Sequence, residues 1–121
     1  MPEYDKAPEA SSLETFPNPN PSRDFSIEID APEFTCVCPK TGHPDFARIT
    51  LTYTPDQECV ELKAYKLYIH AFRNVGIFHE AVTNKIAEDL IAALKPKKLK
   101  LVGTFNAHGG ITTTVTVEHN S

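Results

Sequence analysis

The chain has 121 residues and a net charge of −4, with 12 lysines and arginines against 16 aspartates and glutamates. This length suits one domain, and the acidic balance argues against a nucleic-acid binder, which would present a basic face. No run of 18 apolar residues could span a membrane. Three cysteines without an export signal indicate free thiols. We therefore expect a cytoplasmic protein with no membrane and no nucleic-acid partner.

The first part of the chain, residues 1–23, is rich in proline, glutamate, serine and asparagine and shows no hydrophobic period. Such a composition is typical of a segment that forms no core of its own. We expect an extended arm over residues 1–23, ordered only when docked on a partner surface. Residues 24–121 are predicted to form a single domain.

Hydrophobic periods then mark the first strands and the first helix. Apolar and polar residues alternate in 25–30 and in 47–53, which predicts half-buried strands, and residues 33–37 indicate strand before the loop between them. From Leu62 the apolar residues fall at i, i+3, i+7 and i+10, one face of a helix. This helix is expected to end at residues 74–76.

A second helix and two more strands follow. Residues 80–95 carry apolar side chains at helical spacing, with an acid in the first turn and a lysine in the last, and Pro96 stops the helix. Alternation in 99–105 and 111–117 predicts two strands joined by a turn at Gly109 and its neighbour.

The order of elements is therefore strand, strand, helix, helix, strand, strand. Because consecutive strands usually pair as hairpins, this order predicts an α+β domain with an antiparallel four-stranded sheet and two helices on one face. Such a sheet has two open edges, and proteins must cover such edges. Pairing the edges of neighbouring subunits into a closed barrel is one solution.

The loop between the first two strands carries a thiol and a carboxylate. Residues Cys38–Phe46 read Cys-Pro-Lys-Thr-Gly-His-Pro-Asp-Phe, so Cys38 and Asp45 share a loop that is stiffened by two prolines. A thiol becomes a strong nucleophile as thiolate, and a nearby acid or base is its usual companion. The alternative is a proline-rich turn with an incidental cysteine. Cys59 precedes the first helix and is expected in the core.

Further motifs decide between these alternatives. Glu61–Tyr68 reads Glu-Leu-Lys-Ala-Tyr-Lys-Leu-Tyr, and Phe-Arg-Asn at 72–74 and His-Glu-Ala at 79–81 follow in order. With the cysteine loop, this arrangement resembles the 7-cyano-7-deazaguanine reductases, the QueF family, in its short, single-module form. The resemblance extends from about Phe16 to His119.

The resemblance implies a reaction and two catalytic residues. It implies NADPH-dependent reduction of the nitrile of 7-cyano-7-deazaguanine to the aminomethyl group, a step in the biosynthesis of queuosine, a tRNA modification. Cys38 is similar in position to the family nucleophile, which forms a covalent thioimide with the nitrile carbon. Asp45 resembles the acid/base that manages protons. Without the resemblance, Cys38 could be an inert buried thiol, and Asp45 could cap a turn. Cys36 lies two residues before the nucleophile, and no chemistry is assigned to it.

The resemblance also implies two substrate-binding segments, Val60-Glu61-Leu62 and His79-Glu80. The Glu80 carboxylate would accept two hydrogen bonds from the guanine-like edge of the substrate. On residues alone, Glu80 could equally be an acid that favours a helix N-terminus, and His79 a structural histidine. Leu62 stands where many members have serine, and the family signature allows either.

Cofactor binding is implied for Lys63, Lys66, His108 and Gly109, and Arg73 adds a third cation near the two lysines. The alternative for the lysines is a solvated basic face. No Gly-x-Gly-x-x-Gly motif is present, so no Rossmann site is expected. His108 stands where the family commonly has arginine. Because an imidazole lacks the forked guanidinium, this departure affects the strength of the contact with an NADPH phosphate, or the preference for NADPH over NADH.

The resemblance further implies the tunnelling fold shared with GTP cyclohydrolase I, a ring-forming homo-oligomer with active sites at subunit interfaces, and no metal. One alternative is a zinc-dependent cyclohydrolase-like enzyme using Cys36 or Cys38 with His43, His70 or His79, although no recognisable ligand spacing such as Cys-x-x-Cys is present. The other is a ring-forming protein that binds a purine without catalysis.

Overall fold

The structure is a computed structural model that describes residues 4–106 and 108–121, with the backbone alone for His108. Its strands and helices are β1 (Thr15–Pro17), β2 (Ile27–Val37), β3 (Pro44–Thr54), β4 (Glu58–Val60), α1 (Leu62–His70), α2 (His79–Leu94), β5 (Lys98–Asn106) and β6 (Thr112–Asn120). The described residues also form three short 3₁₀ helices: η1 (Ala10–Ser12), η2 (Ala71–Asn74) and η3 (His108–Gly110).

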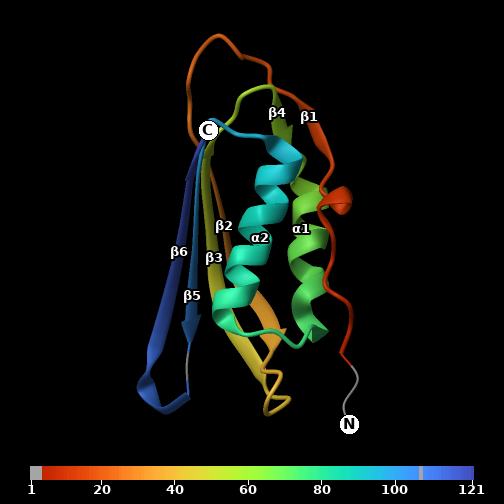
Figure 1. The fold of residues 1–121 in the computed structure, drawn as a ribbon, viewed down its shortest axis with the longest axis vertical. Helices are drawn as coiled ribbons and strands as arrows, with labels where there is room; N and C mark the ends of the chain where they lie inside the picture. The colour runs from red at the N-terminus through yellow and green to blue at the C-terminus, as the bar shows by residue number, and fades with distance from the viewer. Residues whose placement is uncertain (1–3, 107) are drawn as a thin grey trace.

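The main sheet has the strand order β2-β3-β5-β6, and all neighbouring strands are antiparallel. Both helices lie on one face of this sheet, and the described part of the chain leaves the other face uncovered (Figure 1). The predicted α+β class, with four antiparallel strands and two helices on one face, is therefore confirmed. None of the helices in the described part of the chain is long and apolar enough to cross a membrane.

Strand β2 is longer and less regular than the sequence suggested. The two expected segments, 25–30 and 33–37, form one edge strand with a register shift between Ala31 and Phe34. The shift occurs where Pro32 removes a backbone donor, which an edge strand tolerates. The irregularity leaves Pro32 and Glu33 exposed at the sheet edge, a position where such irregularities often re-aim side chains.

The core lies between the sheet and the helices. Alternate residues of β3, including Ile49 and Leu51, point inward and are fully buried, and they belong to the same core cluster as Ile86 and Leu90 of α2. Helix α2 ends where Lys95 adopts a left-handed conformation (φ 46°) immediately before a proline. The predicted core position of Cys59 is confirmed, because its side chain is 2% exposed.

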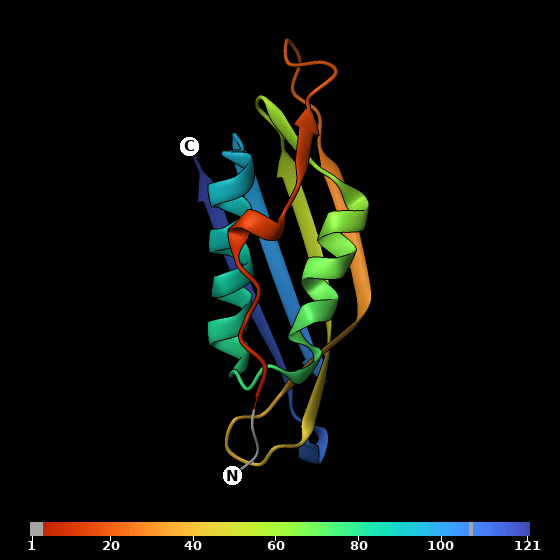
Figure 2. The same ribbon diagram turned by 90° about the vertical axis from the view of Figure 1, so that its right-hand side faces the viewer.

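The N-terminal arm packs on its own chain. Leu13 is buried in the core, β1 pairs with β4, and the N–H of Asp5 donates to the carbonyl of Asn74 at 2.9 Å. Figure 2 shows the arm running over the two helices. The arm thus finds its docking surface on its own domain, whereas the boundary at residue 23 stays a prediction.

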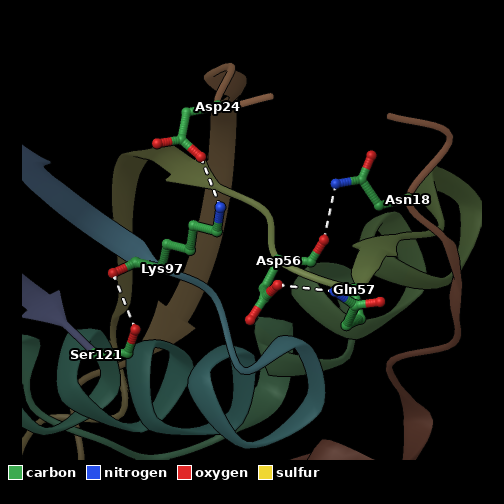
Figure 3. Close-up of polar contacts among 6 residues, drawn as sticks. All are labelled: Asn18, Asp24, Asp56, Gln57, Lys97 and Ser121. Atoms are coloured by element: carbon green, nitrogen blue, oxygen red, sulfur yellow. Dashed lines mark hydrogen bonds and ion pairs between the residues drawn. The ribbon is translucent and has the colours of Figure 1, made fainter. Parts of the chain in front are cut away.

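Several polar contacts connect separate segments of the chain at the end of the molecule that is remote from the cysteine loop (Figure 3). The buried side chain of Asn18 donates to the carbonyl of Asp56 at 2.8 Å. Lys97 donates to Asp24 at 2.7 Å, and the hydroxyl of Ser121 donates to the carbonyl of Lys97 at 3.4 Å. These contacts join the segments that flank the strands of the main sheet at this end of the molecule.

Candidate active site

The cysteine loop is a tight turn between β2 and β3. The N–H of Gly42 donates to the carbonyl of Cys38 at 2.8 Å, and the N–H of Cys38 donates to the carbonyl of His43 at 2.9 Å. Gly42 has φ +75°, a left-handed conformation that side-chain-bearing residues rarely adopt. The glycine in the motif therefore allows the chain to fold back on Cys38.

This turn stabilises the ionised thiol of Cys38. Hydrogen bonds from the Thr41 hydroxyl, and from the backbone N–H groups of Thr41 and Lys40, lower the pKa of the Cys38 thiol. Burial and the charge of Asp45 act in the opposite direction but do not reverse the shift. Cys38 is half-buried and therefore reachable. A reachable thiol with a lowered pKa is the environment that a cysteine nucleophile requires.

Cys36 has the opposite environment. Its side chain is fully buried, and its sulfur lies 3.9 Å from the carbonyl oxygen of Ile77. Burial above all, with the nearby charges of Asp45 and Cys38, raises the pKa of Cys36 to about 12. Two cysteines separated by one residue therefore differ in reactivity, and the geometry supports Cys38 as the nucleophile.

Asp45 begins the inward-facing pattern of β3 directly beside the loop. It is 5% exposed, and its Cα lies opposite that of Cys36 in the strand pair. A carboxylate oxygen of Asp45 lies 3.2 Å from Nε2 of His79. The His79 ring stacks on Phe105, with 4.1 Å between ring centroids and 11° between planes. The carboxylate is thus held between the cysteine loop and the start of α2.

Glu80 follows in the first turn of α2 and is exposed to solvent. The side chain of its neighbour His79 is 20% exposed and contacts the Asp45 carboxylate. The two members of the His-Glu pair therefore differ, since His79 faces the buried Asp45 and Glu80 faces solvent. Of the predicted site residues, the structure brings Cys38, Asp45 and His79 together and places Glu80 at the same end of the domain (Figure 1).

The segment Val60-Glu61-Leu62 lies at the N-terminal end of α1, which is the end of the domain remote from the cysteine loop (Figure 1). The Glu61 carboxylate caps this helix, accepting hydrogen bonds from the N–H groups of Lys63 at 2.8 Å and Ala64 at 2.9 Å, which lowers the pKa of Glu61. Helix α1 and η2 cover nine and four residues, which amounts to about 20 Å of rise. Within one chain the two predicted substrate-binding segments therefore do not meet.

The predicted cofactor residues are also dispersed. Lys63 lines a hollow beside the N-terminal arm, whereas Lys66 lines a different hollow beside β2. Gly109 has φ +70° in the β5–β6 turn, which lies at the same end of the molecule as the cysteine loop. The side chain of His108 lies outside the described part of the structure.

Sequence reasoning missed two supporting residues. The Thr41 hydroxyl hydrogen-bonds to the Cys38 sulfur. Its position three residues after the loop cysteine was a signal from which Thr41 could have been predicted. Phe105 stacks on His79 from β5, and no local pattern connects positions so far apart in the chain. In the described residues, no group of three or more His, Cys, Asp or Glu side chains is arranged to hold a metal ion.

Comparison with known proteins agrees with this geometry. The family model of QueF-like proteins matches residues 44–121. The chain belongs to this family. A relative from Halorhodospira halophila, named NADPH-dependent 7-cyano-7-deazaguanine reductase, is 58% identical over 111 residues, covering 92% of this chain and 94% of the relative. A relative of the same name from Anaeromyxobacter sp. strain K is 60% identical over 107 residues, 88% of each chain.

A solved structure shares the fold of this QueF-family chain. The crystal structure of the archaeosine synthase QueF-Like in the apo form superposes with a TM-score of 0.73 at 20% sequence identity, covering 79% of this chain and 94% of that one. At this identity the likeness concerns the fold. It supports the arrangement of sheet and helices described above.

Proposed function

We propose that this QueF-family chain is an NADPH-dependent reductase that converts the nitrile of 7-cyano-7-deazaguanine to an aminomethyl group. The observation that carries the proposal is the Cys38 thiol, whose pKa is lowered by hydrogen bonds of the loop and is influenced by the charge of the buried Asp45 carboxylate. The names of relatives at 58–60% identity give the substrate and the cofactor. The zinc-dependent alternative is not favoured by these relatives.

The Cys38 thiolate adds to the electrophilic nitrile carbon, which forms a C–S bond and leaves a nitrogen that takes one proton, giving a thioimide. NADPH supplies hydride when it is bound. Conversion of nitrile to amine consumes two hydrides and two protons, and the C–S bond breaks before the amine is complete. The covalent attachment divides a four-electron reduction into steps and retains the intermediate.

Asp45 is the group proposed to carry protons between the thiol and the substrate nitrogen. Its burial and its contact with His79 at 3.2 Å hold the carboxylate in one position. The stacking of His79 on Phe105 fixes the imidazole in turn. Orientation of a general acid by a second group is a common arrangement in enzymes.

Substrate recognition is proposed for Glu80 and His79 at one end of the domain and for Val60, Glu61 and Leu62 at the other. A separation of about 20 Å along α1 and η2 exceeds what a bicyclic base can bridge. We infer that one copy provides the first segment and a second copy provides the other. The open edges β2 and β6 support such a homo-oligomer.

Cofactor contacts are proposed for Lys63, Lys66, His108 and Gly109, all carried over from the family resemblance. A cytoplasmic location and a place in queuosine biosynthesis are proposed on the same basis. No membrane or nucleic-acid partner is proposed.

Purified protein mixed with the nitrile and NADPH tests the function. NADPH oxidation is followed by the loss of its absorbance, and the amine is quantified in the same reaction. We expect two molecules of NADPH to be oxidised for each molecule of amine formed. Oxidation of NADPH without amine, or amine formation that requires added zinc, would contradict the proposal. Tight binding of the nitrile base without any turnover would favour the purine-binding alternative.

A further inference from the structure

The N-terminal arm brings a tyrosine to the cysteine loop. The start of the arm lies at the same end of the molecule as the loop between β2 and β3 (Figure 2). The N–H of Asp5 donates to the carbonyl of Asn74 at 2.9 Å, so the arm is held beside the segment that joins η2 to α2. Tyr4, the residue before Asp5, is half-buried. An aromatic side chain of the arm is therefore packed near the loop that carries the nucleophile.

The ring of Tyr4 packs directly on the backbone of Gly76. A Cβ atom placed on Gly76 would lie 2.5, 2.8 and 2.9 Å from three ring carbons of Tyr4, well inside the optimal separation of two carbons. Gly76 is not among the residues with positive φ, so its backbone conformation does not require glycine. The missing side chain at Gly76 therefore serves the close approach of the Tyr4 ring.

Gly76 in turn lies against the residue that precedes the nucleophile. It forms a parallel bridge with Val37, the last residue of β2. The N–H of Val37 donates to the carbonyl of Val75, and the N–H of Ile77 donates to the carbonyl of Val37, both at 3.0 Å. The tyrosine ring, the glycine backbone and the end of β2 therefore form a continuous set of contacts at the start of the cysteine loop.

The hydroxyl end of Tyr4 reaches the turn that follows the nucleophile. A Cβ atom placed on Gly42 would lie 3.8 Å from the Tyr4 hydroxyl oxygen. Apart from Thr41 and His43, which adjoin this glycine in the chain, no described residue brings another heavy atom within 4 Å of that position. Thr41 and Gly42 are otherwise exposed. Tyr4 is therefore the support that a distant segment gives to this side of the turn.

This turn supplies the hydrogen bonds that stabilise the Cys38 thiolate. The Thr41 hydroxyl and the N–H groups of Lys40 and Thr41 bond the sulfur and lower the pKa of the thiol. Hydrogen bonds weaken steeply when their geometry is lost, and an exposed turn with few packing contacts opens at low cost in free energy. A side chain that packs against both the start and the turn of the loop favours the form in which the donors converge on the sulfur.

We propose that Tyr4 is a positioning residue of the cysteine loop, whose ring on Gly76 and hydroxyl beside Gly42 hold the turn in the form that bonds the Cys38 sulfur. The link to catalysis rests on the proposed function, because that function makes Cys38 the nucleophile. Tyr4 acts through the loop and not on the substrate. The arm thereby takes part in the reactivity of the site, in addition to covering the helices.

Alkylation of Cys38 by iodoacetamide across a pH series tests this role without substrate. The midpoint of the pH profile reports how well the thiolate is stabilised, and the rate at high pH reports access to the sulfur. Tyr4→Ala should move the midpoint to higher pH, because a loosened turn loses the hydrogen bonds that lower the pKa of Cys38. The variant leaves Asp45, Lys40 and His43 in place, so the shift does not come from a changed charge. An unchanged midpoint in Tyr4→Ala would overturn the proposal.

Tyr4→Phe is the conservative variant, because it keeps the ring on Gly76. Its midpoint should lie closer to that of wild type than to that of Tyr4→Ala. Equal shifts in the two variants would contradict the contact of the ring with Gly76 as the cause.

Asn18→Ala is the matched control at the other end of the arm. It removes the hydrogen bond from the Asn18 side chain to the carbonyl of Asp56, remote from the cysteine loop (Figure 3). The variant should melt below wild type, because a buried side chain loses its hydrogen bond, and it should keep the wild-type alkylation midpoint. A shift as large as that of Tyr4→Ala would show that general loosening of the arm moves the thiol, and the proposal would fail.

Gly76→Ala tests the same contact from its other side. The new methyl group would occupy the place of the Tyr4 ring, so the displaced ring should move the midpoint in the same direction as Tyr4→Ala does. The double variant Tyr4→Ala/Gly76→Ala should be shifted no further than the more strongly shifted single variant, because both substitutions remove one contact. Additive shifts would refute the contact as the common cause.

Adduct formation with 7-cyano-7-deazaguanine separates this proposal from the proposed function. At pH 7, Tyr4→Ala should form the adduct about fivefold or more slowly than wild type, a small part of the roughly 10²-fold that a misplacement of about 1 Å can cost. If wild type forms no adduct, the proposed function fails, and the alkylation midpoints still decide the role of Tyr4. A wild-type rate of adduct formation in Tyr4→Ala would refute the positioning role and leave the proposed function intact.

Discussion

Replacing Asp45 by asparagine should change two observables in opposite directions. Asparagine keeps the size of the side chain, and its amide oxygen can still accept from His79, now 3.2 Å from the carboxylate. It cannot carry a proton, so turnover should fall roughly 10²-fold or more, the usual contribution of a general acid or base. A loss of this size corresponds to about 2.7 kcal/mol in the activation barrier.

The thiol should respond differently to the same substitution. The charge of Asp45 raises the pKa of Cys38 against the hydrogen bonds that lower it, so removing this charge should lower the Cys38 pKa further. Alkylation of Cys38 by iodoacetamide should then begin at lower pH than in wild type. Cys36 should stay unreactive near neutral pH, because burial is the main cause of its raised pKa.

The assay is a pH series of alkylation rates, read by peptide mass spectrometry, beside steady-state NADPH oxidation. Asp24→Asn is the control, because Asp24 pairs with Lys97 at the other end of the molecule, and both observables should match wild type. Near wild-type turnover in Asp45→Asn would refute the acid/base role. An alkylation profile shifted to higher pH would refute the electrostatic reasoning.

Three other substitutions test separate parts of the account. Thr41→Val should shift Cys38 alkylation to higher pH, because a hydrogen bond to the sulfur is lost, and Thr41→Ser should restore the wild-type profile; identical profiles for both would contradict this. Glu80→Leu should weaken nitrile binding in isothermal titration about fivefold or more by leaving substrate donors unpaired; unchanged affinity would remove Glu80 from recognition. Asp89→Ala should destabilise the protein by about 1–3 kcal/mol in urea unfolding, because the Asp89 carboxylate accepts from the buried Tyr68 hydroxyl at 2.5 Å; a stability equal to wild type would show that this link between the helices contributes nothing.

The elements with a long, regular period were predictable from the sequence. Both helices and the four main strands show hydrophobic spacing over five or more residues, and the structure confirms each of them. Strands β1 and β4 have three residues each and pair across more than 40 positions of chain, from Thr15 to Val60. No local pattern encodes such a pair, so neither strand was predicted.

The candidate site was predictable where its residues share one loop, and less so where distant segments meet. Cys38 and Asp45 follow from the loop sequence and the family resemblance, and their roles stay predictions until tested. The contact between Asp45 and His79, and the stacking on Phe105, depend on how α2 and β5 pack against β3. The divergence of Lys63 and Lys66 into different hollows likewise depends on the arm and on β2, which flank α1 on opposite sides.

The central claim is that Cys38 attacks the nitrile carbon, and intact-mass spectrometry tests it most directly. Protein incubated with 7-cyano-7-deazaguanine in the absence of NADPH should gain the mass of one substrate molecule per chain, and peptide mapping should locate the addition on Cys38. Cys36→Ala should retain the adduct, and Cys38→Ala should lose it together with turnover. An adduct mapped to Cys36 or Cys59, or full turnover in Cys38→Ala, would contradict the account.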